Sequence, residues 1–174
     1  MIIYRDLLTG DEIIADTSKI IDAGNGLWEV DGRMIKKGAE NIVLAGANPS
    51  AEGEDADEGG EEGASEPVLD LADQFRYQKM EGVSKKVYQA DLKKYMKALV
   101  EKMREAGKSE EEIKAFQSEA PAAAKKILGN WDNYDVYKGE SMGEVAMYVL
   151  VDFREDGMTP YATVWKHGLE EYKV

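Results

Sequence analysis

The sequence predicts an α+β fold with a mainly antiparallel β core. Short apolar runs of strand-like composition occupy both ends of the chain, and a long middle segment has the apolar spacing of helices. The connections between the terminal runs are short, which favours antiparallel pairing. The 174 residues suit one domain with a substantial core.

The first core segment, about residues 1–47, contains several strand candidates. "MIIYRDLL" and "EIIAD" flank a turn at residues 9–11, and "NIVLAG" is a further apolar run. Between them, "GLWEVDGRMIK" places two β-like runs on either side of Asp31 and Gly32, a pair that accepts the positive φ angles of a type I′ turn. We therefore expect a β-hairpin centred on Asp31 and Gly32.

The segment "NPSAEGEDADEGGEEGASEP", residues 48–67, is strongly acidic. It carries eight carboxylates, no Lys or Arg and no large apolar side chain. It contributes −8 to a net charge of −13, so the rest of the chain is only mildly acidic. Such a composition cannot offset the entropy lost on ordering, and we expect a mobile acidic loop inserted into the core.

The acidic loop is also a candidate calcium site. Read from Asp55, it partly matches an EF-hand loop, with Asp55 and Asp57 at positions 1 and 3 and Glu66 at position 12. Gly59 at position 5 offers no ligand oxygen, and no amphipathic helix precedes the loop. Loose, weak calcium binding by clustered carboxylates and a merely solvated loop are the alternatives to an EF-hand. The candidate ligands for weak calcium binding are Glu54, Asp55, Asp57 and Glu58.

Residues 84–130 are expected to form a helical hairpin. Ser84 is a good N-cap and Gly107 a good residue to follow the first helix. Ser109 and Glu112 have the capping-box spacing for the second helix, which Pro121 should kink or split. The apolar stripe of the first helix is Val87, Leu92, Tyr95, Met96, Leu99 and Met103.

The other strand candidates flank this hairpin. "VLDLADQFRYQKM" before it reads as a strand within residues 68–80. After it, "YDVYK", "VAMYVLVDF" and "YATVWK" supply strands within residues 133–167.

The charged face of the first helix suggests an acidic partner. Lys93, Lys94 and Lys97 belong to a basic cluster on an otherwise acidic chain. A polyacidic protein tail would complement this face, and a solvated helix surface is the alternative. The acidic net charge argues against direct nucleic-acid binding and against an anionic lipid surface.

The residue inventory contains no positive sign of an enzyme. The chain has no cysteine, which excludes disulfides, thiol catalysis and cysteine-based zinc sites. His167 is the only histidine, and we expect it at the surface. The glycines lack the spacing of a phosphate-binding loop, so no nucleotide site is predicted. There is no signal-peptide pattern and no apolar run long enough to span a membrane, so we expect a cytoplasmic protein.

Five islands of the sequence resemble the translationally controlled tumour protein family. They are "MIIYRDLLTGDE", "GANPSAEGED", "YKGESM", "REDGMTPY" and "KHGLEE", in the family's order and spacing. The resemblance covers the chain from Met1 to Lys173. It implies an antiparallel β core similar to Rab-binding nucleotide-free chaperones, with a projecting helical hairpin and a mobile acidic loop.

The resemblance also implies partners and site residues. The family is described as binding calcium, tubulin and microtubules, a translation elongation factor, and small GTPases such as Rheb. Glu12 and Glu140 match the family's acidic pair on a proposed GTPase-facing groove, and Asn48, Ser50 and Glu52 lie in its first signature. Asn48 and Ser50 can equally cap local backbone.

The chain departs from the family pattern in two places. It ends in Val174, where many members end in cysteine, so a disulfide dimer through that end is excluded. "SMGEVAM" differs from the usual acidic turn beside Glu140. We expect a non-enzymatic protein with several partners, linked to protein synthesis, cell growth and microtubule stabilisation, with calcium binding. The alternatives are a low-affinity calcium-binding protein and a regulator of nucleotide exchange on a Rheb-like GTPase.

Overall fold

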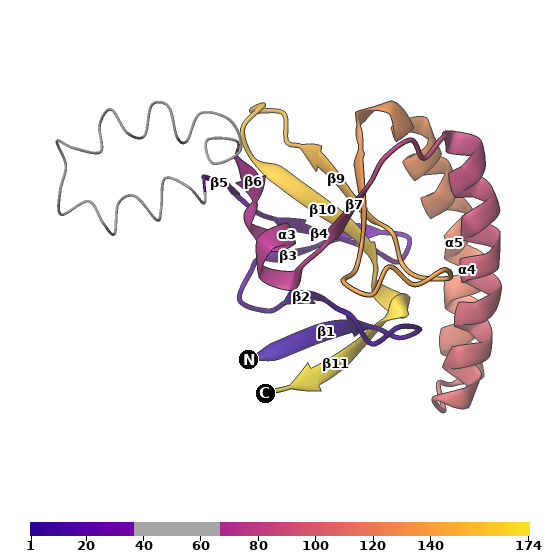
Figure 1. Cartoon of the computed structure of the whole chain (residues 1–174). Coiled ribbons are helices and arrows are strands. Elements are labelled where there is room, and N and C mark those ends of the chain that lie inside the picture. The colour runs from indigo at the N-terminus through magenta and orange to yellow at the C-terminus, as the bar shows by residue number, and fades with distance from the viewer. Residues whose placement is uncertain (37–66) are drawn as a thin grey trace, which may run out of the picture.

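The computed structural model describes residues 1–36 and 67–174, which form antiparallel sheets and a pair of long helices. Figure 1 shows the two helices side by side along one flank of the sheets, with both chain termini at the end of the smaller sheet. The α+β class is confirmed. The "NIVLAG" run and almost all of the acidic loop lie outside the described residues. None of the helices in the described ranges combines the length and apolarity of a transmembrane span.

The larger sheet has six strands in the order β3-β4-β10-β9-β8-β7, all paired antiparallel. Neighbours in the sheet come from distant parts of the sequence, since β4 pairs with β10 and β7 with β8. The strands are β3 Ile20–Gly24, β4 Leu27–Asp31, β7 Gln78–Met80, β8 Asp135–Lys138, β9 Val149–Phe153 and β10 Pro160–Trp165.

The expected hairpin at Asp31 and Gly32 is wrong. The turn lies earlier, between β3 and β4, where Asn25 and Gly26 have φ values of 56° and 83°. These residue types tolerate the left-handed region that a tight hairpin turn demands. After β4 the chain leaves the sheet, and β5 (Met34–Ile35) pairs instead with β6 (Val68–Leu69).

The smaller sheet joins the two ends of the chain in the order β11-β1-β2. Strand β1 (Ile2–Asp6) lies between β2 (Glu12–Ala15) and β11 (Leu169–Lys173). The core strands therefore extend past residue 167, where the sequence-based boundary stood. The short helix η4 (Lys166–Gly168) turns the chain from β10 into β11.

The segment expected as one strand within residues 68–80 is broken by a helix. β6 ends at Leu69, α3 spans Asp70–Phe75, and β7 follows. Leu71 and Phe75 are four residues apart and both are buried, which is helical rather than strand spacing. Arg76 ends the helix with a φ of 58°.

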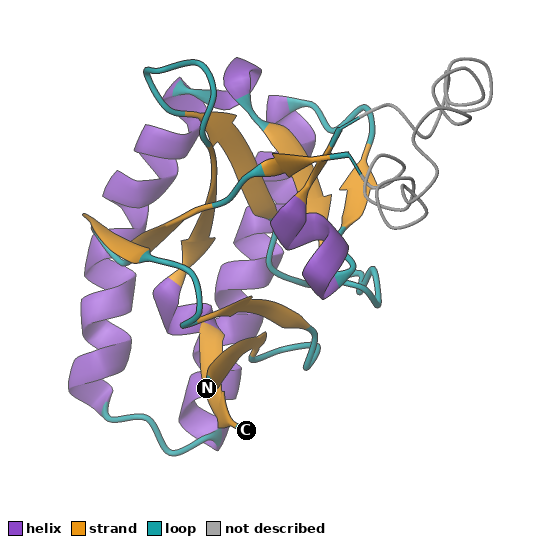
Figure 2. Ribbon diagram, turned by 90° about the vertical axis from the view of Figure 1, so that its left-hand side faces the viewer, coloured by secondary structure: helices purple, strands orange, loops and turns teal. Residues whose placement is uncertain are grey.

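The helical hairpin forms as expected, from α4 (Lys85–Glu105) and α5 (Glu110–Gly129). The side chains of Ser84 and Ser109 accept hydrogen bonds from the backbone N–H groups three residues later, and so cap both helices. α5 is continuous through Pro121, so the helix is not split there. Figure 2 shows both helices against the sheets. The short helix η3 (Trp131–Asn133) follows α5.

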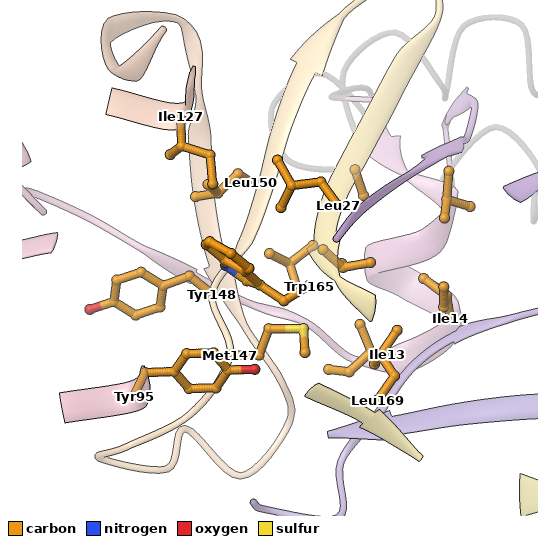
Figure 3. Close-up of a cluster of buried hydrophobic side chains, with 14 of the residues drawn as sticks. Ile13, Ile14, Leu27, Tyr95, Ile127, Met147, Tyr148, Leu150, Trp165 and Leu169 are labelled. Atoms are coloured by element: carbon orange, nitrogen blue, oxygen red, sulfur yellow. The ribbon is translucent and has the colours of Figure 1, made fainter. Parts of the chain in front are cut away.

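The core lies between the hairpin and the sheets. Tyr88 is buried on α4, and Val87, which the apolar pattern placed in the stripe, is 49% exposed. Figure 3 shows Tyr95 and Ile127 of the helices facing Trp165, while Ile13 and Leu169 extend the same cluster into the smaller sheet. One apolar core therefore joins the helical hairpin, the six-stranded sheet and the smaller sheet. This shared core fixes the loops of the smaller sheet relative to the hairpin.

Candidate partner-binding surfaces

The segments that carry Glu12, at the start of β2, and Glu140, after β8, are bound to each other. Ser141 Oγ donates a hydrogen bond of 2.7 Å to Asp11 Oδ2, and the Ser141 N–H lies 3.2 Å from the same oxygen. An alanine Cβ at Gly139 would lie 2.7 Å from Asp11 Cβ, so this close approach requires glycine. The structure therefore brings together the two segments that contain the predicted acidic pair, 130 residues apart in sequence.

Both glutamates are exposed. Glu140 Oε1 lies 3.5 Å from Arg76 Nη1, with 56% and 70% of the two side chains exposed. An ion pair this exposed contributes little to stability, so Glu140 can exchange its partner at low cost. Arg76 was not among the sequence-predicted residues, because nothing in its local sequence pattern indicates the contact with Glu140.

Two buried charged residues shape the loop after Glu140. Lys138 Nζ donates to the carbonyl of Gly143 at 2.8 Å, and the Asp6 carboxylate accepts from the N–H of Met147 at 2.9 Å. Burial raises the pKa of Asp6, and its backbone hydrogen bonds oppose that rise. Residues 139–148, which include the start of the expected strand "VAMYVLVDF", form an irregular loop because these side chains hold their backbone.

The other candidate partner-binding and calcium-binding residues lie outside the described residues. They are Asn48, Ser50, Glu52, Glu54, Asp55, Asp57 and Glu58. Within residues 1–36 and 67–174, no group of three or more histidine or carboxylate side chains is arranged to hold a metal ion.

The basic candidates Lys93, Lys94 and Lys97 are exposed on α4. They are not equivalent. Lys93 and Lys97 line a groove of about 760 Å³ between α4 and α5, whereas Lys94 does not. The floor of this groove is apolar and its rim on α4 is basic, a combination that the helical periodicity alone did not reveal.

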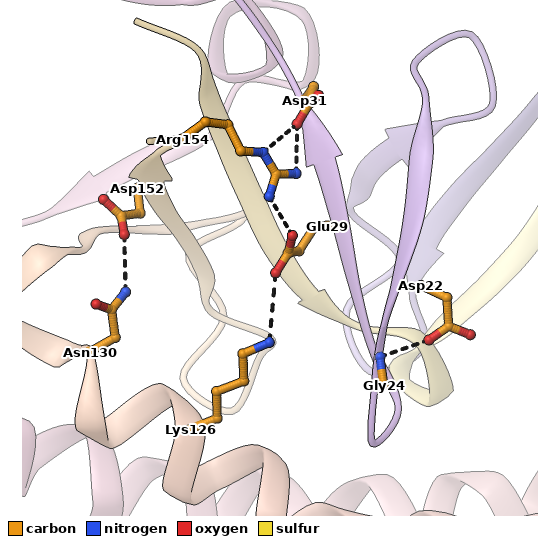
Figure 4. A network of polar contacts seen from close by, with 8 residues as sticks. All are labelled: Asp22, Gly24, Glu29, Asp31, Lys126, Asn130, Asp152 and Arg154. Atoms are coloured by element: carbon orange, nitrogen blue, oxygen red, sulfur yellow. Dashed lines mark hydrogen bonds and ion pairs between the residues drawn. The ribbon is translucent and has the colours of Figure 1, made fainter. Parts of the chain in front are cut away.

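A polar cleft of about 700 Å³ lies between the end of α5 and the six-stranded sheet. Figure 4 shows its charged groups engaged with one another. The Arg154 guanidinium bonds Glu29 at 2.6 Å and Asp31 at 2.7 Å, and it stacks 3.8 Å above the Tyr161 ring. Lys126 of α5 also lies 3.8 Å from Glu29. This network ties α5 to strand β4 and leaves these charges paired.

His167 is half-buried, which corrects its expected surface position. Its ring lies 5.4 Å from that of Phe116, and its buried Nδ1 has no hydrogen-bond partner among the described residues. Burial, followed by the charge of Lys166, lowers the pKa of His167. Its ring packs against Phe116 of α5.

Comparisons with known proteins cover the whole chain. The profile of the family described as "Translationally controlled tumour protein" matches residues 1–170. The chain is 54% identical to the translationally-controlled tumor protein homolog of Aspergillus oryzae and 40% identical to that of Saccharomyces cerevisiae, with 100% of each chain covered in both cases.

Solved structures give the same result. The chain matches the translationally controlled tumor-associated protein p23fyp of Schizosaccharomyces pombe with a TM-score of 0.77, at 40% identity and 100% coverage of both chains. The Caenorhabditis elegans translationally-controlled tumor protein, 24% identical, matches with a TM-score of 0.67 over 100% of this chain and 99% of its own, and supports the fold alone.

Proposed function

Because the chain belongs to the translationally controlled tumour protein family, we propose that it is a cytoplasmic, non-enzymatic protein that acts by binding other proteins. Its contributions would be to protein synthesis, cell growth and microtubule stabilisation. The observation that carries the proposal is the contact between Asp11 and Ser141, since it holds the segments of Glu12 and Glu140 together with both glutamates exposed.

The acidic pair is proposed to receive a basic face of a small GTPase of the Rheb type. Glu12 begins β2 and Glu140 follows β8, and the hydrogen bond between Asp11 and Ser141 holds their segments together. The proposal requires one basic partner to reach both carboxylates. Arg76 occupies one side of Glu140 in the free protein through a weak, exposed contact, which a basic partner can replace. Regulation of nucleotide exchange would be a consequence of such binding.

Charge reversal tests this surface. Glu12→Lys and Glu140→Lys are expected to change the free energy of unfolding by less than about 1 kcal/mol, because exposed charges contribute little to folding. Each should weaken binding to a Rheb-like GTPase by about tenfold or more, because an attractive contact becomes repulsive. Glu155→Lys, an exposed reversal on the β9–β10 turn, is the matched control.

The outcome separates binding from scaffolding. If Glu12→Lys and Glu140→Lys lower the melting temperature sharply while the folded fraction binds as the wild type does, the two glutamates serve the fold. If the Glu155→Lys control weakens binding equally, only the overall charge matters.

A second candidate contact is supported by the exposed lysines of α4. We propose that Lys93, Lys94 and Lys97 attract acidic segments of tubulin or of a translation elongation factor. Association through exposed charges should weaken steeply with salt. Co-sedimentation with microtubules that is unchanged between low and high ionic strength would argue against this contact.

We also propose that the acidic segment, residues 48–66, which lies outside the described ranges, binds calcium weakly. Clustered carboxylates without a preformed cage should bind calcium in the range of about 10⁻⁴–10⁻³ M. Calorimetric titration of the whole chain, compared with a chain whose residues 48–66 are replaced by a short Gly-Ser linker, measures the contribution of this segment. Equal calcium binding by both chains would contradict it.

A further inference from the structure

The apolar groove between α4 and α5 has the form of a helix-binding site. Its walls come from residues one helical turn apart, so the groove runs along the two helices rather than across them. The small residues Ala120 and Ala124 of α5 line it and are only partly buried, which leaves room for a close backbone approach. The rest of the apolar lining includes Met96 and Val100 of α4 and Leu128 of α5.

The charges around this groove are asymmetric. The wall on α4 carries Lys93, Lys97 and Arg104 against a single acidic residue, Glu101. Arg104 forms an ion pair with Glu110 at 3.6 Å. Within the described residues, Lys93 and Lys97 form no ion pair. The wall on α5 contributes Gln117 and no charged side chain. An occupant with negative charge along one edge would therefore match the groove.

We propose that the groove binds an amphipathic helix of a partner protein, with the apolar side of that helix on Ala120 and Ala124 and its acidic residues facing Lys93 and Lys97. This inference rests on the proposed role of the basic face and narrows it to a partner with both an apolar stripe and acidic flanks. Helices recognised in this way present apolar anchors three and four residues apart.

Charge disfavours the two other ready occupants. In a second copy docked by the same groove, a two-fold axis across the groove would place basic wall against basic wall. A two-fold axis along the groove would place each basic wall against the α5 wall, which has no charged side chain, so neither arrangement supplies an acidic partner. An anionic membrane would be repelled by the net charge of −13. An acidic amphipathic helix meets neither obstacle.

The probe is a synthetic peptide of about 18 residues with leucines at helical i, i+3, i+4 and i+7 spacing and glutamates on the flanks. Two further peptides serve as comparisons. One has the same composition in an order that forms no apolar face, and one has lysine in place of each glutamate. We expect saturable binding of the first peptide and at least about tenfold weaker binding of the other two.

Matched variants locate the binding. Lys97 lines the groove and Lys94 does not, although both are exposed on α4. Lys97→Glu should weaken binding of the amphipathic peptide by about fivefold, and Lys94→Glu should weaken it by less than about twofold. Ala120→Glu should abolish binding, whereas Ala122→Glu, exposed on the same helix outside the groove, should not. Melting curves confirm that each variant is folded.

Several results would overturn the groove. In one such result, the peptide without an apolar face binds as tightly as the amphipathic one, and Lys94→Glu and Lys97→Glu have equal effects. That result would support binding by the basic face and would contradict the groove as the binding site. Binding that survives Ala120→Glu would also remove it. Failure of both acidic peptides to bind would contradict the groove and the basic face together. A dimer in light scattering that Ala120→Glu dissolves, or binding of phosphatidylserine vesicles, would assign the groove to another occupant.

Discussion

At the scale of single residues, Gly168 is the point where the smaller sheet packs closely against the hairpin. It follows β10 within η4, and the hydroxyl of Tyr95 lies against the place where a side chain would begin. A Cβ there would also lie 2.7 Å from Met147 Cε. Real Cβ atoms do not approach so closely, so a side chain at this position would have to displace the buried Tyr95 hydroxyl and the end of Met147.

Gly168→Ala should therefore destabilise the protein by about 1–3 kcal/mol, the usual cost of overpacking a filled core. Urea unfolding followed by tryptophan fluorescence measures this. Gly129→Ala is the control, because it lies at the end of α5 with open space around it, and alanine favours helix there. A Gly168→Ala variant as stable as the control would show that Tyr95 can move aside.

His167 should give the fold a pH dependence in the range near neutrality. Burial lowers its pKa from the ordinary value of 6.5, and Lys166 adds to this, while Glu119 and Glu112 oppose it. The unfolded chain then binds a proton more readily than the native one. The contribution of His167 to stability is therefore full above about pH 6.5 and is lost as the pH falls through the lowered native pKa.

The replacement His167→Gln isolates this effect, since the chain has no other histidine. Between pH 7.5 and 5.5, the free energy of unfolding should fall more for the wild type than for the variant. Parallel losses in both proteins would show that other groups, such as the buried Asp6, govern stability in this range.

At the scale of elements, the second helix depends on its first turn. Ser109 accepts a hydrogen bond of 3.1 Å from the N–H of Glu112, and three glutamates occupy that turn. Ser109→Ala should cost about 1 kcal/mol, because one N–H loses its partner at the positive end of the helix. Ser118→Ala, in the middle of α5, is the control and should have little effect on the melting temperature.

The elements that the sequence predicted well are those with strong local signals. Serine caps and apolar spacing located both long helices, because these signals depend on neighbours three or four residues away. α3 was missed because six residues contain too few turns for a clear period. β11 was missed because its burial pattern has a single buried residue, Leu169, and its existence depends on pairing with β1 at the other end of the chain.

At the scale of the whole molecule, the candidate site follows from topology rather than local pattern. No spacing rule connects Asp11 with Ser141, and the buried charges of Asp6 and Lys138 acquire meaning only once the sheets are assembled. Resemblance to a family was able to name Glu12 and Glu140. The contact between Glu140 and Arg76 could not be predicted from the sequence, because the two residues meet only after β7 pairs with β8.

The same topology predicts that residues 48–66 contribute little to the stability of the fold. β5 and β6 pair with each other, with Ile35 opposite Val68, so the two ends of the intervening chain are held together by strand pairing. The entropy of closing a loop changes by only about 0.6 kcal/mol for each doubling of its length. Replacing residues 48–66 with a short Gly-Ser linker should therefore leave the free energy of unfolding within about 1 kcal/mol of the wild type, or raise it slightly. Urea unfolding of both chains is the measurement, and a lost cooperative transition in the shortened chain would mean that the segment packs against the core.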